Sequence, residues 1–217
     1  LLASSAASDV YKRQGTDYGI SLSRYNSALQ FIPISQITGT GDGNQFYSLF
    51  RDSKGFYWFG GTNGLIRFTD PAGDKHNAIW YRMGDKTYPL SHNRIRHIYE
   101  DKEQQLWIAT DGSINRYDYA TRQFVHYNIV DSTGTYNTNW TYYMFEDNAG
   151  HLWISTCLGG IFVVDKHRLM QSASGQYVAE QNYSVHNGLS GMFINQIIPD
   201  NEGNVWVLSL IHISEPT

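Results

Sequence analysis

The sequence predicts an all-β fold, a partial β-propeller made of four-stranded blades, on three observations. A strand, a tight turn and a second strand carrying a tryptophan recur four times, at Trp-to-Trp intervals of 49, 46 and 53 residues. Repeats of this length, filled with strand and turn patterns, are typical of propeller blades. In every copy an aspartate lies six residues before the tryptophan: Asp52 and Trp58, Asp101 and Trp107, Asp147 and Trp153, Asp200 and Trp206. Aromatic residues make up 15% of the chain and charged residues only 17%, which favours strands over exposed amphipathic helices.

The clearest blade is predicted over residues 92–127, as a meander of four strands named a to d. The strands are expected at 95–100, 106–110, 114–117 and 123–127. Asp101 opens the turn between strands a and b, because an aspartate side chain can bond backbone amides two residues further on. Gln104 stands where the other three copies have Gly, so this turn is expected to be strained or of another type.

The same pattern divides the chain into a half blade, three whole blades and the first half of another. These are predicted at 15–35, 43–82, 92–127, 139–185 and 192–207. Such a set does not close a ring, so we expect a fragment of a larger propeller.

The two ends of the chain are expected to be translated adapter DNA. Residues 9–14 can be encoded by GATGTGTATAAGAGACAG, and the reverse complement of that DNA encodes residues 208–213. One element inverted at both ends resembles the transposase mosaic end used in sequencing libraries. Residues 1–14 and 208–217 are therefore set aside, and the native propeller stretch is expected over 15–207.

Composition and spacing exclude several classes of function. The net charge is −4 and the Lys and Arg residues are dispersed, so no direct contact with nucleic acid is expected. Cys157 is the only cysteine, which excludes a disulfide framework. The histidines lack the spacing of metal ligands, and there is no Gly-rich phosphate loop or nucleophile elbow. We therefore expect no catalytic residue, no metal and no cofactor.

The repeated Trp and Asp residues are interpreted as structural. A residue needed at the same position in every blade is most simply explained by packing between blades for Trp and by turn formation for Asp. Sugar stacking by the four Trp and catalysis by the four Asp are the functional alternatives. Carboxylates at equivalent places on different blades would not lie close enough to act together.

A sialidase-like or lyase-like propeller enzyme is the main enzymatic alternative. The Asp box of sialidases places Gly two residues and an aromatic five residues after Asp. Here the offsets are three and six, as in the run from Asp147 through Gly150 to Trp153. The motif is therefore a different one, and no cluster of arginines with a Tyr–Glu pair is recognisable. A purely structural interaction propeller is the third alternative.

The candidate ligand-binding residues lie in loops expected on one rim of the propeller. Because strands alternate in direction, the loops before each strand a and the turns between strands b and c share that rim. Loops on a rigid scaffold are where binding residues concentrate. The candidates combine hydrogen-bonding groups, a cation and an aromatic ring, which suits a polar or anionic sugar: Asn63, His92, Asn93, Arg94, Asp111, Asn139 and Trp140.

Residues 90–112 and 139–160 closely resemble the regulator-propeller repeat. Its pattern is small residues, Asn, an apolar strand, an Asp-x-x-Gly turn, apolar-Trp-Ile-Gly-Thr and Gly-Leu. Residues 43–68 match this repeat as well, and residues 192–207 match its first half. The four copies in register extend the resemblance over essentially all of 15–207. The stretch is similar to the periplasmic sensor domain of hybrid two-component systems from Bacteroidota.

The resemblance implies a larger, membrane-anchored and homodimeric parent protein. Its expected parts are two tandem seven-bladed propellers, a β-sandwich, a membrane helix, a histidine kinase and often a DNA-binding output; related propellers also precede cyclase domains. Many such sensors detect oligosaccharides released from glycans and switch on genes for carbohydrate use. The resemblance therefore implies a periplasmic, non-enzymatic sensor segment with an oligosaccharide ligand.

Overall fold

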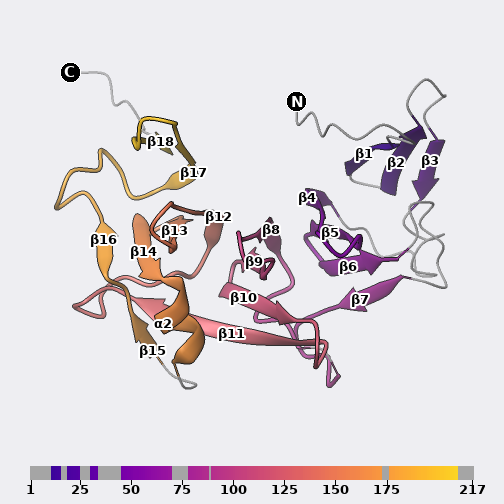
Figure 1. Ribbon diagram of the computed structural model, residues 1–217, viewed down its shortest axis with the longest axis horizontal. Helices are drawn as coiled ribbons and strands as arrows, with labels where there is room; N and C mark the ends of the chain where they lie inside the picture. The colour runs from indigo at the N-terminus through magenta and orange to yellow at the C-terminus, as the bar shows by residue number, and fades with distance from the viewer. Residues whose placement is uncertain are drawn as a thin grey trace, which may run out of the picture.

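The computed structural model describes residues 11–15, 19–24, 30–33, 45–69, 78–87, 89–172 and 176–209, with side chains from residue 45 onward. The strands of this part form five sheets arranged in an arc (Figure 1). Four strands lie on the concave side of the arc, one from each of the later sheets: β4 (Phe46–Arg51), β8 (Ile95–Glu100), β12 (Thr141–Glu146) and β17 (Ile194–Pro199). Each is the expected innermost strand of a blade.

The first sheet consists of β1 (Tyr11–Gly15), β2 (Gly19–Arg24) and β3 (Gln30–Pro33), in that order and antiparallel. Residues 11–14 of β1 belong to the stretch that we assign to adapter DNA. At the other end, β18 (Val205–Ser209) also extends into the assigned adapter.

The second and third sheets contain the predicted four-stranded meanders. The second is formed by β4, β5 (Tyr57–Gly61), β6 (Gly64–Phe68) and β7 (Ile79–Tyr81). The third is formed by β8, β9 (Leu106–Thr110), β10 (Ser113–Asp118) and β11 (Gln123–Val130), close to the four predicted ranges. The all-β, partial-propeller prediction is confirmed.

The fourth sheet departs from a plain meander. It pairs β12, β13 (His151–Thr156), β14 (Ile161–Asp165) and β16 (Gln181–Tyr183). Between β14 and β16 the chain forms α2 (Lys166–Gln171) and β15 (Gln176–Val178), and β15 pairs in parallel with β11 of the third sheet. The third sheet therefore has five strands. The sequence did not predict this crossing, since a three-residue strand that joins a neighbouring sheet has no local signature.

The apolar core lies between neighbouring sheets. Trp58 of the second sheet packs edge-on against Tyr117 of the third, with ring centroids 5.0 Å apart. Trp107 shares a buried cluster with Met144 of the fourth sheet and Leu169 of α2. Burying such large aromatic side chains between sheets is the main source of stability expected for a propeller.

The repeated Asp closes its turn and also holds the Trp of the same repeat. In each copy one carboxylate oxygen accepts a hydrogen bond from the indole nitrogen, at 2.7, 2.9, 2.9 and 3.0 Å along the chain. The other oxygen accepts from a backbone amide four residues further on. The indole bond was not foreseen, and it explains why the six-residue spacing is constant.

Gln104 adopts the same left-handed conformation as the glycines that it replaces. Its φ is 62°, against 88°, 85° and 89° for Gly55, Gly150 and Gly203. The turn is therefore of the same type and carries the strain expected for a residue with a side chain at positive φ.

Candidate ligand-binding rim

Backbone hydrogen bonds tie the loops of one rim into a continuous series across the second, third and fourth sheets. Each bond joins a turn between strands b and c to a loop before a strand a, within one sheet or between neighbours. The bonds are Gly64 N to Asn93 O (2.7 Å), Asp111 N to Arg94 O (3.2 Å), Trp140 N to Asp111 O (3.0 Å) and Cys157 N to Trp140 O (3.0 Å). The expected shared rim is thus present as a rigid scaffold.

Three predicted candidates use polar groups to hold this rim together. The Asn63 carbonyl accepts hydrogen bonds from Trp80 Nε1 and Arg82 Nε at 2.9 and 3.2 Å. Asn93 Oδ1 accepts from the backbone of Met83 at 2.6 Å. His92 Nδ1 accepts from the Arg94 amide at 3.0 Å. These groups position the loops from which they come.

Asp111, in the turn between β9 and β10, joins two arginines. Arg96 Nε and Nη2 lie 2.7 and 3.2 Å from its two carboxylate oxygens, and Arg94 Nε lies 3.8 Å away. The Arg96 guanidinium also lies 4.6 Å from the centre of the Tyr142 ring. Burial would lower the pKa of Arg96, but its hydrogen bond and attraction to Asp111 outweigh this and raise that pKa. Arg96 is therefore a fixed cation whose charge Asp111 largely neutralises.

Arg96 and Tyr142 belong to a set that sequence reasoning missed. Strands β4, β8, β12 and β17 each skip one residue in their pairing, immediately after their first residue. A skipped residue of this kind is a β-bulge, which bends the strand and re-aims a side chain, often beside a functional site. The skipped residues are Tyr47, Arg96, Tyr142 and Asn195.

Two hollows open on the fourth-sheet part of the rim. The inner hollow has a volume of about 390 Å³ and is lined by Thr135, Tyr136, Asn137, Asn139, Trp140, Leu158 and Gly159. Trp140 is 48% exposed and has a φ of 55°, a conformation that its backbone bonds to Asp111 and Cys157 hold in place. Asn137 Oδ1 accepts from the Asn139 amide at 2.9 Å.

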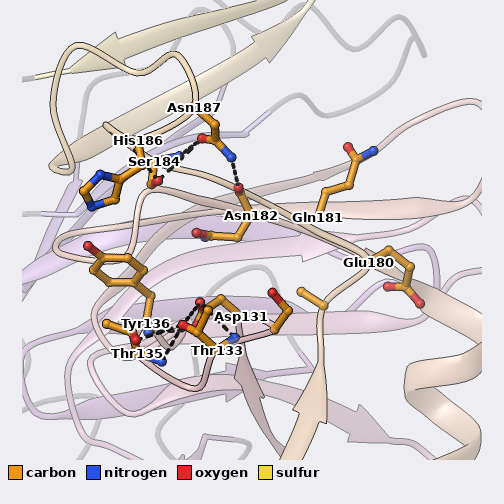
Figure 2. A pocket seen from close by; sticks show the side chains of 12 residues that line it. Asp131, Thr133, Thr135, Tyr136, Glu180, Gln181, Asn182, Ser184, His186 and Asn187 are labelled. Atoms are coloured by element: carbon orange, nitrogen blue, oxygen red, sulfur yellow. Dashed lines mark hydrogen bonds between the residues drawn. The ribbon is translucent and has the colours of Figure 1, made fainter.

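The outer hollow, also about 390 Å³, lies beside β16, the edge strand of the fourth sheet. Its lining comes from the loop after β11 and from β16 with its flanking residues: Asp131, Ser132, Thr133, Thr135, Tyr136, Ala179, Glu180, Gln181, Asn182, Ser184, His186 and Asn187. Figure 2 shows Asn187 bridging two of these neighbours, since its Oδ1 accepts from the Ser184 amide at 2.6 Å and its Nδ2 donates to the Asn182 carbonyl at 2.7 Å. Thr135 and Tyr136 line both hollows.

Of the seven candidate binding residues, the structure places Asn139 and Trp140 in the inner hollow. The side chains of Arg94 and Asp111 lie together, and these two residues line neither hollow. Sequence reasoning missed Tyr136 and all of the outer hollow. The lining residues from β16 reach the outer hollow because the chain first crosses to the third sheet in β15, and no local sequence pattern predicts that crossing.

Similarity to known proteins decides the family. The family model described as two component regulator propeller matches residues 40–63, 89–112 and 188–210. A solved structure of the extracellular domain of BT4673 from B. thetaiotaomicron matches at 91% identity with a TM-score of 0.81, over 92% of this chain and 27% of that chain. A second structure of that domain matches at 87% identity and a TM-score of 0.80, over 94% and 27%. The chain carries two-component regulator propeller repeats.

This regulator propeller spans about a quarter of the length of the BT4673 domain. One of the two structures describes BT4673 as a hybrid two-component system and the other as a one-component system. The extracellular domain of BT3049 from B. thetaiotaomicron, described as a hybrid two-component system, matches at 18% identity with a TM-score of 0.65, over 92% of this chain and 24% of that one. The predicted periplasmic position of the segment is confirmed by these extracellular domains.

A lyase shares the fold of the regulator propeller. Virginiamycin B lyase from Staphylococcus aureus matches at 14% identity with a TM-score of 0.65, over 95% of this chain and 61% of that chain. This degree of identity shows a common fold alone. The search of curated proteins gives no match.

The described part of the regulator propeller holds no group of three or more His, Cys, Asp or Glu placed to bind a metal ion. Within the same residues, no helix has the length and apolar content needed to cross a bilayer. Asp131, one of two carboxylates that line the outer hollow, is used inside its own loop, where it accepts from the Tyr136 and Thr133 amides at 2.7 and 3.2 Å. Burial would raise the pKa of Asp131, but these bonds and one from the Thr133 hydroxyl lower it.

Proposed function

We propose that this regulator propeller is part of the ligand-sensing region of a hybrid two-component system, and that its rim binds an oligosaccharide released from a glycan. One observation carries the proposal: Trp140, which is exposed, lines a hollow together with Asn137 and Asn139. An aromatic face packs on the apolar face of a sugar ring, and amides donate to and accept from its hydroxyl groups. The volume of the hollow lies within the range of ligand pockets, roughly 300–1,000 Å³.

The rigidity of the rim supports a sensing role. Trp140 is fixed at positive φ by backbone bonds to Asp111 of the third sheet and Cys157 of the fourth. A preorganised site loses little free energy to ordering when a ligand binds. Binding can then favour one arrangement of the parent protein over another. In the proposed parent, a membrane-anchored homodimer, a histidine kinase detects that shift and regulates genes for carbohydrate use.

The test is calorimetric titration of the whole extracellular segment that contains this chain with neutral and anionic oligosaccharides. Trp140→Ala is expected to weaken binding about tenfold or more, which corresponds to about 1.4 kcal/mol. Arg94→Ala tests whether the arginines beside Asp111 contact the ligand, because Arg94 is 45% exposed and only loosely paired with Asp111. Val125→Ala, on the exposed face of β11, is the matched control and should bind normally.

Unchanged affinity in both the Trp140 and Arg94 variants would show that the ligand binds elsewhere. Thermal melts of each variant separate loss of binding from loss of folding. Mass spectrometry of the saccharide after incubation distinguishes sensing from the enzymatic alternative, since a sensor returns the glycan intact. A segment that bound a protein but no saccharide would instead support the interaction propeller.

A further inference from the structure

The outer hollow owes its shape to the strap that joins the third and fourth sheets. β15 pairs with β11 through Asn128–Gln176, Ile129–Tyr177 and Val130–Val178, and the Ala179 amide then donates to the Val130 carbonyl at 2.9 Å. From there the chain crosses to β16, which brings Gln181 and Asn182 beside the loop that follows β11 (Figure 2). The hollow is therefore built by paired strands on one side and a hydrogen-bonded loop on the other.

The side chains of this hollow offer polar groups around an aromatic ring. Asn182 uses its Nδ2 to donate to the carbonyls of Gly159 and Ile161, which fixes the amide plane. Gln181 Oε1 accepts from the Tyr183 hydroxyl at 2.8 Å, and in Figure 2 the Gln181 side chain points away from Tyr136 and the Asp131 loop. His186 is exposed and lies in Figure 2 on the same side as the Tyr136 ring. This mixture of flat ring and amide groups is of the same kind as that in the inner hollow.

Tyr136 connects the two hollows. Its ring packs partly against the buried cluster of the third and fourth sheets, and its residue lines both spaces. The loop that carries it is held by Asp131, which accepts from the Tyr136 amide, and by a bridge between Val130 and Asn137. The wall between the hollows is thus a fixed aromatic residue that a chain-like ligand could cross.

The charges around the hollows select the class of ligand. Among the described residues that line them, none is Lys or Arg. Asp131 is satisfied within its loop, and Glu180 accepts from the Asp165 amide at 2.9 Å and from the Tyr177 hydroxyl at 2.7 Å. A carboxylated or sulfated sugar would find no cation here to offset the loss of its hydration. An uncharged sugar meets no such cost.

The geometry points to one extended site in which a neutral, linear oligosaccharide runs from the inner hollow across Tyr136 into the outer hollow. This inference rests on the proposed function and extends it in two ways. It adds a second subsite. It also restricts the ligand to uncharged glycan chains that are longer than the inner hollow alone can hold. The parent would therefore respond to longer fragments more sensitively than to short ones.

The experiment compares ligand length with the position of the substitution. Disaccharides and hexasaccharides of glucose, galactose, mannose and xylose, with a hexamer of galacturonic acid as the anionic probe, are titrated into the whole extracellular segment. The outer variants are Asn182→Ala and His186→Ala, the inner variant is Trp140→Ala, and the control is Val125→Ala. His186 is exposed and Asn182 is half-buried, and thermal melts check that both outer variants fold.

Support for the extended site is a loss of about tenfold in hexasaccharide affinity in the outer variants, with disaccharide affinity within about twofold of the unsubstituted segment. Trp140→Ala should weaken the binding of both lengths. Outer variants that bind the hexasaccharide normally, while Trp140→Ala loses it, would overturn the extended site and leave the proposed function standing. Tighter binding of the galacturonic acid hexamer than of every neutral probe would overturn the neutral class. If no probe binds, or if Trp140→Ala and Arg94→Ala are also both without effect, the proposed function fails together with the inference.

Discussion

Hydrogen bonds join the second sheet to the third and the third sheet to the fourth. The two contacts share their pattern of bonds but use different residues. In both, the amide after the repeated Asp donates to the last residue of the next sheet's inner strand. Ser53 N lies 2.9 Å from Glu100 Oε2, and Lys102 N lies 2.8 Å from Glu146 Oε2. A second shared bond joins the inner strands: Ile98 N donates to Ser48 Oγ at 3.1 Å, and Met144 N to His97 Nδ1 at 3.2 Å.

The two contacts differ in the group that reaches across to the repeated Asp. Asp52 accepts a 2.7 Å bond from the hydroxyl of Tyr119, whereas Asp101 lies 3.2 Å from the buried ammonium of Lys166. Lys166 also lies 2.9 Å from Glu146 Oε1. Both donors follow strand c of the next sheet, one from a turn and one from α2. The repeated Asp and Trp thus stabilise each sheet in the same way, whereas the group that reaches the Asp from the next sheet differs between the two contacts.

Charge makes the second contact more dependent on a single residue. Burial would lower the pKa of Lys166, but the carboxylates of Glu146 and Asp101 outweigh it and raise that pKa, so the lysine stays charged. At the first contact, burial and the neighbouring Asp52 carboxylate raise the pKa of Tyr119, which remains a protonated donor. A buried ion pair is costly to break from one side, whereas a neutral donor is less so.

The largest effect is therefore expected from Lys166→Met. It leaves the buried Asp101 and Glu146 without their cation, and should lower the free energy of unfolding by about 3–5 kcal/mol. Urea denaturation of the whole extracellular segment measures it. Lys102→Met is the matched control, because Lys102 is exposed and should cost less than about 1 kcal/mol. Equal losses in the two variants would remove the distinction between the two contacts.

The shared bond between inner strands predicts a pH effect at the second contact alone. His97 stacks on Tyr143 at 4.0 Å, and burial lowers its pKa to about 4, against an ordinary value of 6.5. Since the unfolded chain takes up this proton first, stability is full above pH 6.5 and falls as pH drops toward 4, by up to about 3 kcal/mol. Urea titrations at both ends of this window should show a smaller loss for His97→Gln than for the unsubstituted segment.

The exposed His126→Gln variant is the control for that measurement. An unchanged pH dependence in His97→Gln would mean that His97 is not held neutral by its surroundings. Ser48, which accepts the equivalent bond at the first contact, does not titrate in this range.

A smaller effect is expected from Tyr119→Phe. Asp52 loses one hydrogen bond but keeps its bonds to Trp58 and to the Phe56 amide, so the cost should be about 1–2 kcal/mol. Urea denaturation alongside Lys166→Met compares the two contacts directly. A loss as large as that of Lys166→Met would show that the neutral donor matters as much as the charged one.

The smallest effect concerns the turn at each contact. Gln104→Gly should stabilise the segment by about 0.5–1 kcal/mol, because Gly accepts a φ of 62° without strain, less the entropy that Gly loses on folding. The reciprocal change, Gly150→Gln, places a side chain at a φ of 85° and should cost a similar amount. Thermal melts that show the same sign for both changes would contradict the account of strain.

The sequence predicted the elements that have a local pattern, and missed those that are defined by contacts between strands. The strands of the third sheet and the shared rim followed from local patterns and from the alternation of strand direction. The four β-bulges could not be predicted, since a skipped residue such as Arg96 is defined by its pairing with another strand. Asn139 and Trp140 were placed on the rim correctly, because their place follows from the order of strands and loops. Tyr136 and Gln181 were not considered as lining, because their place depends on the pairing of β15 with β11. Whether the rim candidates bind a ligand stays a prediction.

β15 has a consequence for how such a protein can evolve. Its three residues lie in the repeat of Trp153, which forms the fourth sheet, but they complete the outer edge of the third sheet. Recombination that exchanged this repeat for one with a short link between strands c and d would remove an edge strand from the third sheet. It would also carry Gln181 and Asn182 away from the loop after β11. We therefore expect these two blades to be exchanged only together, although the sequence contains a separate repeat for each.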